Sequence, residues 1–263
     1  MHEFAFVFAG FAVGLVVGLT GVGGGSLMTP ILIFVFGIKP HLAIGTDLLF
    51  AAFTKMGGTI SLARARIVDW RIVGQVAAGS LPASLITLYV LHLLGPANPA
   101  TQTVMTTTLG LALLLTAGAT FYKVLRGKAV PLAIAPELIH QATRAQHWAL
   151  PVLFGAVIGT LVTITSVGAG AIGVIVLMML YPALPLPRIV AADIAHAVPL
   201  TLVAGLGHAS IDSVDWPLLL KLLAGSLPGI WLGTQLMRKT PDRVIRSLLS
   251  ALLAYAGVKL ISI

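Results

Sequence analysis

Long runs of apolar residues follow one another along this chain of 263 residues, and charged residues rarely interrupt them. Hydrophobic residues make up 58% of the sequence and charged residues 9%, whereas a soluble domain carries about 25% charged residues. One soluble core cannot bury so much apolar surface, so we expect lipid to surround much of the chain. Runs rich in Leu, Ala, Val and Gly favour helices over the alternating strands of a barrel. We therefore predict an all-α, polytopic transmembrane helix bundle.

Ten apolar segments are predicted, and most are long enough to cross a hydrocarbon core of about 30 Å. They run over 4–20, 25–37, 42–62, 71–94, 101–124, 148–165, 170–182, 188–208, 216–236 and 243–262. Segments 25–37 and 170–182 are too short to cross comfortably, and each follows a Gly-rich break. We predict that both are half-helices or re-entrant pieces.

The two halves of the chain repeat one another. At an offset of 146 residues, 68–70 (Val-Asp-Trp) matches 214–216, and 78–82 (Ala-Gly-Ser-Leu-Pro) matches 224–228. Generic membrane composition explains matches of Ala and Leu, but it does not explain Val-Asp-Trp twice. Common ancestry of the two halves is therefore the better interpretation.

Loop charges indicate how the halves are related. Loop 63–71 carries three Arg residues, whereas its repeat partner 209–215 carries two Asp and no Lys or Arg. The next pair of loops has the opposite bias, because 95–100 is uncharged and 237–246 carries four basic residues. By the positive-inside rule, equivalent loops then lie on opposite faces of the membrane, so the repeats are inverted. The predicted organisation is a first transmembrane repeat, a basic cytoplasmic linker and a second repeat, over 1–122, 123–147 and 148–263.

Several classes of function are disfavoured. The absence of cysteine excludes disulfides, zinc–thiolate sites and cysteine nucleophiles. The net charge of +8 comes from Lys and Arg clustered between apolar runs, which is typical of cytoplasmic loops rather than of a nucleic-acid surface. No Walker, H-E-x-x-H or G-x-S-x-G motif occurs, so we expect no enzyme, no cofactor and no metal site. No sequence feature specifies the oligomeric state.

The Gly-rich breaks are candidate anion sites. The run 20–26 (Thr-Gly-Val-Gly-Gly-Gly-Ser) precedes one short segment, and 163–170 (Thr-Ile-Thr-Ser-Val-Gly-Ala-Gly) precedes the other. Glycines let backbone approach a ligand, and the start of the following helix presents free N–H groups and a positive dipole end. Two such ends pointing inward form a midplane anion site. Alternatively, the glycines permit close packing of helices.

Charged residues lie within the third segment of each half. A charged side chain in the membrane costs about 2.5–3.5 kcal/mol on insertion scales, so each needs a reason. Asp47 and Lys55 share a broad helix face but stand too far apart to pair directly, whereas Asp193 and His196 can touch. Lys55 is a candidate counter-charge for an anion, and Asp47, Asp193 and His196 are candidates for proton coupling or gating. Alternatively, the aspartates cap helices or tie the repeats together; Asp47 follows Gly-Thr, as it would near a helix start.

These residues resemble the sulfite exporter TauE/SafE family of bacterial membrane transporters, also described as organosulfur-compound permeases. Three features carry the resemblance over nearly the whole chain: the run 18–30 (GLTGVGGGSLMTP), the run 43–47 (AIGTD) with Lys55, and the two Val-Asp-Trp motifs. The resemblance implies a multi-pass transporter of a small sulfur-containing anion in a bacterial or archaeal plasma (inner) membrane. The sequence departs from the family where 167–170 (Val-Gly-Ala-Gly) replaces a fuller glycine run.

The resulting hypothesis is a secondary transporter of sulfite, sulfoacetate or a related organosulfonate, with the lipid bilayer and a coupling proton as further partners. The candidate substrate-binding residues are Thr20, Gly23, Gly24, Gly25, Ser26, Lys55, Thr165, Ser166 and Gly170. The alternatives are a proton- or cation-coupled transporter of another small solute and an intramembrane enzyme.

Overall fold

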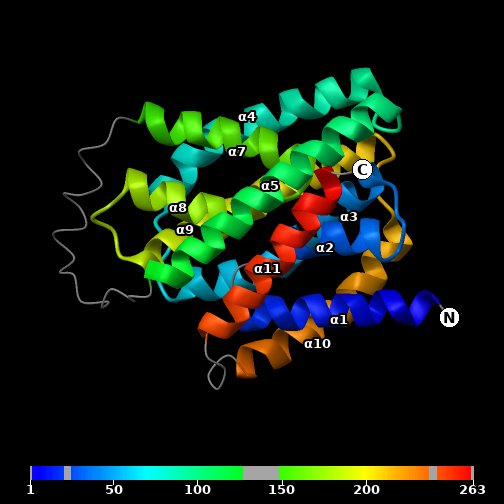
Figure 1. The fold of residues 1–263 in the computed structure, drawn as a ribbon. Helices are drawn as coiled ribbons and strands as arrows, with labels where there is room; N and C mark the ends of the chain where they lie inside the picture. Colours follow the sequence, from blue (N-terminus) through cyan, green and yellow to red (C-terminus); the bar gives the residue numbers. More distant parts are fainter. Residues whose placement is uncertain (1, 21–24, 127–147, 237–241, 262–263) are drawn as a thin grey trace.

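The computed structural model describes residues 2–20, 25–126, 148–236 and 242–261, and helices cover almost all of them (Figure 1). The described ranges contain no β-strand. The helices are α1 (His2–Thr20), α2 (Gly25–Phe34), α3 (Pro40–Arg64), α4 (Trp70–Leu94), α5 (Pro99–Arg126), α7 (Ala149–Thr165), α8 (Ala171–Leu180), α9 (Leu186–Ser210), α10 (Trp216–Leu236) and α11 (Asp242–Ile261). The predicted all-α fold is confirmed.

The lengths of the helices follow the hydropathy pattern. Helices α2 and α8 have 10 residues each, which gives a length of about 15 Å at 1.5 Å per residue. Within the described residues, four helices are long and apolar enough to cross a membrane: α4, α5 over Pro99–Phe121, α9, and α10 over Trp216–Gly233. Helix α5 continues to Arg126, into the predicted linker 123–147, and the rest of that linker lies outside the described residues.

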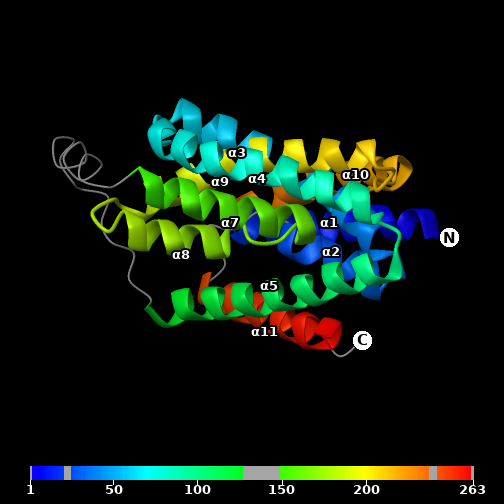
Figure 2. The same ribbon diagram turned by 90° about the horizontal axis from the view of Figure 1, so that it is seen from above.

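Helices of the first half pair with helices of the second half. Helix α1 packs against α10, α4 against α7, α3 against α9 and α5 against α11. In Figure 2, α5 and α11 form a layer of their own beside the remaining helices. Each pair therefore joins the two halves. Their opposite orientation across the membrane stays a prediction.

Two of these interfaces use the same contacts between glycine and backbone. A Cβ at Gly155 of α7 would lie 2.1 Å from the carbonyl oxygen of Val76 in α4, and a Cβ at Gly10 of α1 would lie 2.3 Å from that of Leu222 in α10. No side chain fits at such a distance, so glycine lets each pair of helix backbones approach.

The repeated Val-Asp-Trp motif begins a helix in both halves. The Asp69 carboxylate accepts hydrogen bonds from the backbone N–H groups of Arg71 (3.1 Å) and Ile72 (3.4 Å) at the start of α4. The Asp215 carboxylate accepts from Leu218 N–H (3.0 Å) at the start of α10. These are N-caps, which satisfy donors that a helix start leaves unpaired.

Apolar side chains cover the outer faces of the helices. On α4, for example, Ile86, Tyr89 and Leu93 are each more than 60% exposed, although Ile72 and Val76 of the same helix are buried. An exposed apolar face of this extent suits contact with lipid rather than water.

Candidate functional site

Helices α3 and α9 pack against each other and run antiparallel. A Cβ at Gly205 of α9 would touch Leu49 of α3, and the Thr59 hydroxyl donates to the Ile194 carbonyl at 3.5 Å. The first half of α3 thus contacts the last part of α9, and the last part of α3 contacts the first part of α9. This arrangement places Lys55 between the levels of the two aspartates, Asp47 and Asp193.

Asp47 is fully buried and ties α3 to the short helix α2. Its Oδ2 accepts a hydrogen bond from the backbone N–H of Thr29 at 3.2 Å and another from the Thr29 hydroxyl. The prediction that Asp47 stands near a helix start is wrong. Helix α3 begins at Pro40, after Lys39, because proline is favoured in the first turn of a helix.

Asp193 has the same relation to the other short helix. It is 3% exposed, and its Oδ1 would lie 2.0 Å from a Cβ built on Gly173 of α8. Each aspartate therefore lies against the short helix that precedes its own helix in the sequence. Neither caps its own helix, since α9 begins at Leu186.

Lys55 joins these two carboxylates into one cluster. Its ammonium group is buried within electrostatic reach of both Asp193 and Asp47, and His196 is buried within reach of Lys55. The structure thus brings together all four charged or titratable residues that the sequence singled out.

His196 has a partner that the sequence did not predict. Its Nε2 lies 2.7 Å from the Ser80 hydroxyl of α4, and both side chains are buried. The two residues are 116 positions apart in the chain, so helical spacing alone could not reveal the contact.

The second Gly-rich break ends α7 and begins α8. The Thr165 hydroxyl donates to the Leu161 carbonyl at 2.6 Å and accepts from Val167 N–H at 3.1 Å, so it stabilises its own turn. Ser166 adopts a left-handed conformation with φ of +60°. Gly170, directly before α8, has φ of +128°, a conformation that glycine tolerates well.

Ser166 points toward the cluster. Its hydroxyl lies beside the Asp47 carboxyl group, to which it can donate a hydrogen bond. Ser166 is 5% exposed, so this contact places the end of the second Gly-rich break against α3 inside the protein.

The first Gly-rich break is described only at its edges. Gly23 and Gly24 lie outside the described residues, whereas Thr20 ends α1 and Gly25 begins α2. The side chains of Thr20 and Ser26 are outside the description as well. Their predicted contacts with an anion stay a prediction.

Two further buried contacts were missed by sequence reasoning. The Thr163 hydroxyl of α7 lies 2.7 Å from the Ser84 hydroxyl of α4, and His208 Nε2 of α9 lies 2.9 Å from the Thr163 carbonyl oxygen. Serine and threonine in apolar helices are common and give no signal of their partners, which explains the omission.

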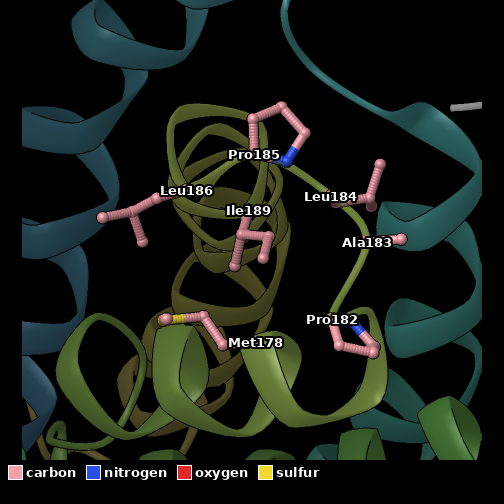
Figure 3. A pocket seen from close by; sticks show the side chains of 7 residues that line it. All are labelled: Met178, Pro182, Ala183, Leu184, Pro185, Leu186 and Ile189. Atoms are coloured by element: carbon pink, nitrogen blue, oxygen red, sulfur yellow. The ribbon is translucent and has the colours of Figure 1, made fainter. Parts of the chain in front are cut away.

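A pocket of about 140 Å³ lies elsewhere, at the loop between α8 and α9 (Figure 3). It is lined by Met178, Pro182, Ala183, Leu184, Pro185, Leu186 and Ile189. None of these is a predicted site residue, and the lining offers no charge to an anion. Over the described ranges, no three His, Asp or Glu side chains are grouped to hold a metal ion.

Comparison with known proteins identifies the family of the chain. The model of the sulfite exporter TauE/SafE family matches residues 6–260. The chain belongs to this family. It is 34% identical to the probable membrane transporter protein YjnA of Bacillus subtilis, over 97% of this chain and 98% of that protein. It is 28% identical to the probable membrane transporter protein YdhB of the same organism, over 95% and 97% of the two chains.

An archaeal relative, the probable membrane transporter protein MJ0441 of Methanocaldococcus jannaschii, is 23% identical over 96% of this chain and 92% of its own. No solved structure matches the chain significantly. As a member of the TauE/SafE family with apolar helices long enough to cross a bilayer, the protein is a multi-pass membrane transporter of the plasma membrane.

Proposed function

We propose that this TauE/SafE transporter moves a small sulfur-containing oxyanion, either sulfite or an organosulfonate such as sulfoacetate. The observation that carries the proposal is Lys55, whose buried ammonium group on α3 lies within electrostatic reach of two buried carboxylates. A buried cation requires compensation, and a transported anion supplies it when Asp47 or Asp193 is protonated.

The anion sits beside Lys55, between the two Gly-rich breaks. Backbone N–H groups near Gly23, Gly24, Gly25 and Gly170 hold its oxygens, as at other helix starts. The hydroxyls of Thr20, Ser26 and Ser166 assist; Thr165 contributes by shaping the turn, because its proton is already donated to Leu161.

The charges of the cluster favour coupling of the anion to protons. One ammonium group faces two carboxylates, so the cluster already carries excess negative charge when Lys55, Asp47 and Asp193 are all ionised. An anion that enters adds to this excess, and buried like charges repel strongly. Proton uptake by Asp47, Asp193 or His196 offsets the added charge, so anion and proton bind together.

Transport in proteoliposomes tests the proposal. We expect counterflow of labelled sulfite or sulfoacetate at equal pH on both sides, and no counterflow of a neutral solute of similar size. If none of sulfite, sulfoacetate or sulfate exchanges, and none raises the melting temperature of the purified protein, the anion proposal is wrong.

The same transport assay also tests the alternative that the protein is a cation-coupled transporter of another small solute. The Asp47 carboxylate and the Ser166 hydroxyl are buried oxygens side by side, which can also accept a coupling cation. Exchange that needs sodium but no anion would favour that alternative.

A further inference from the structure

The α4–α7 and α1–α10 interfaces pack alike around a pair of serines. A Cβ at Gly159 of α7 would lie 2.3 Å from the carbonyl oxygen of Ser80, and a Cβ at Gly14 of α1 would lie 2.4 Å from that of Ser226. Ser80 and Ser226 are both fully buried. They are equivalent positions of the internal repeat, so each is a natural control for the other.

The hydroxyls of these serines have different partners. Ser80 Oγ lies 2.7 Å from His196 Nε2 on α9, whereas Ser226 Oγ donates to the carbonyl of Leu223 in its own helix at 3.2 Å. Phe50 stands at the repeat position of His196. The glycine packing of such an interface therefore does not require a histidine.

The polar contacts continue one helical turn beyond Ser80. Three fully buried residues make these contacts: Ser84, Thr163 and His208. The hydroxyls of Ser84 and Thr163 lie 2.7 Å apart, and the Thr163 carbonyl oxygen lies 2.9 Å from His208 Nε2, near the end of α9. At the offset of 146, the repeat positions of Ser84 and His208 hold Ile230 and Leu62. With the offset of 145 that aligns Gly10 and Gly14 with Gly155 and Gly159, the repeat position of Thr163 holds Gly18. Buried polar groups cost free energy unless they are hydrogen-bonded. Since apolar residues serve at the repeat positions, the polar line has a purpose other than packing.

A serine hydroxyl suits a histidine that changes its protonation state. The hydroxyl can donate to a neutral imidazole nitrogen and accept from a protonated one. The Ser80–His196 contact can therefore persist in both states. The ammonium group of Lys55 opposes a second positive charge on His196, and an anion bound at Lys55 relieves that repulsion.

The groups that bear on His196 come from two helices. On α3 they are His41, Asp47, Lys55 and Arg64, and on α9 they are Arg188, Asp193 and His208; Lys55 acts on His196 directly. Helices α7 and α8 contain no titratable side chain, and those of α4 (Arg71, Tyr89 and His92) lie toward its ends.

We infer that the α4–α7–α9 interface is the proton-coupling side of the transporter and that Ser80 is the positioning residue for His196. The neutral imidazole of His196 binds a proton from water when the anion is bound, and it returns that proton to water when the anion leaves. Ser84, Thr163 and His208 extend the polar line from His196 toward the end of α9. This inference rests on the proposed anion transport.

Two assays in proteoliposomes separate the inference from the proposed function. Counterflow of labelled sulfite at equal pH measures anion exchange. Accumulation of labelled sulfite driven by an imposed pH gradient measures coupling, with protein-free liposomes as the control for passive leak. The variants are Ser80→Ala and, as the matched control, Ser226→Ala.

We expect Ser80→Ala to retain counterflow. Its gradient-driven accumulation should fall by about tenfold, which corresponds to the loss of one hydrogen bond of above-average strength. Ser226→Ala should retain both activities, and both variants should keep the wild-type melting temperature within a few degrees. Unchanged gradient-driven accumulation in Ser80→Ala would overturn the inference. So would a loss of counterflow and accumulation in equal measure, which indicates a structural role.

Wild-type protein that exchanges sulfite but ignores the pH gradient would also overturn the inference while leaving the proposed function intact. Wild-type protein that exchanges no anion would refute the proposed function itself, and the inference with it.

Discussion

The α4–α7 and α1–α10 interfaces share their backbone contacts and differ in the side chains beside them. In both, glycines of one helix lie against carbonyl oxygens of the other. Only the α4–α7 interface places a serine against a histidine of α9. This packing needs only glycine at the contact points, so the residues at neighbouring positions of the same helices can differ between the two interfaces. One interface can therefore acquire polar chemistry while its counterpart keeps the fold.

The same contrast recurs between α3 and α9. Lys55 of α3 is buried near two carboxylates, whereas its repeat position holds Thr201, whose hydroxyl donates to Ala197 of its own helix at 2.8 Å. The charge is thus placed on one half only, although both halves supply an aspartate.

The largest effect is expected at this pair of positions. Lys55→Met removes the counter-charge at nearly constant size, so anion affinity should fall by about 10- to 100-fold, which corresponds to ~1.5–3 kcal/mol for a contact to a charged group. Thr201→Val should change the affinity by less than about twofold, because its hydroxyl serves its own helix. Thermal-shift titration with sulfite measures both. Wild-type affinity in Lys55→Met would remove Lys55 from the site.

The glycine contacts should respond equally in the two interfaces. A Cβ at Gly79 would lie 1.9 Å from the Val152 carbonyl oxygen, and a Cβ at Gly225 would lie 1.9 Å from that of Val7. Overpacking costs about 1–3 kcal/mol, so Gly79→Ala and Gly225→Ala should each lower the melting temperature by several degrees. A large drop in one variant alone would break the equivalence of the two interfaces.

The smallest effect is expected at the helix caps. Asp69→Ala and Asp215→Ala each remove a side-chain acceptor from the first turn of α4 or α10, at a cost of about 1 kcal/mol. Both variants should melt slightly earlier than the wild type and still exchange sulfite. Loss of exchange in only one of them would reveal a role beyond capping in that half.

The sequence predicted the helices well and their partners poorly. Hydropathy and Gly-rich breaks located every described helix to within a few residues, because both signals are local. The contact of Asp47 with Thr29 joins two helices, and the contact of Ser80 with His196 joins the two halves. Such contacts depend on how the helices pack. Helix α3, for example, is predicted over 42–62 and runs over Pro40–Arg64, with proline in its first turn.

A tryptophan follows each of the two capping aspartates. Trp70 and Trp216 follow Asp69 and Asp215 directly, and they are 59% and 52% exposed. Indole rings favour the boundary between lipid and water. Each half of the transporter therefore carries an intrinsic fluorophore at the first turn of one of its long helices. If the repeats are inverted as predicted, these two rings would lie at opposite surfaces of the bilayer, and the distance between them would report the thickness of the membrane.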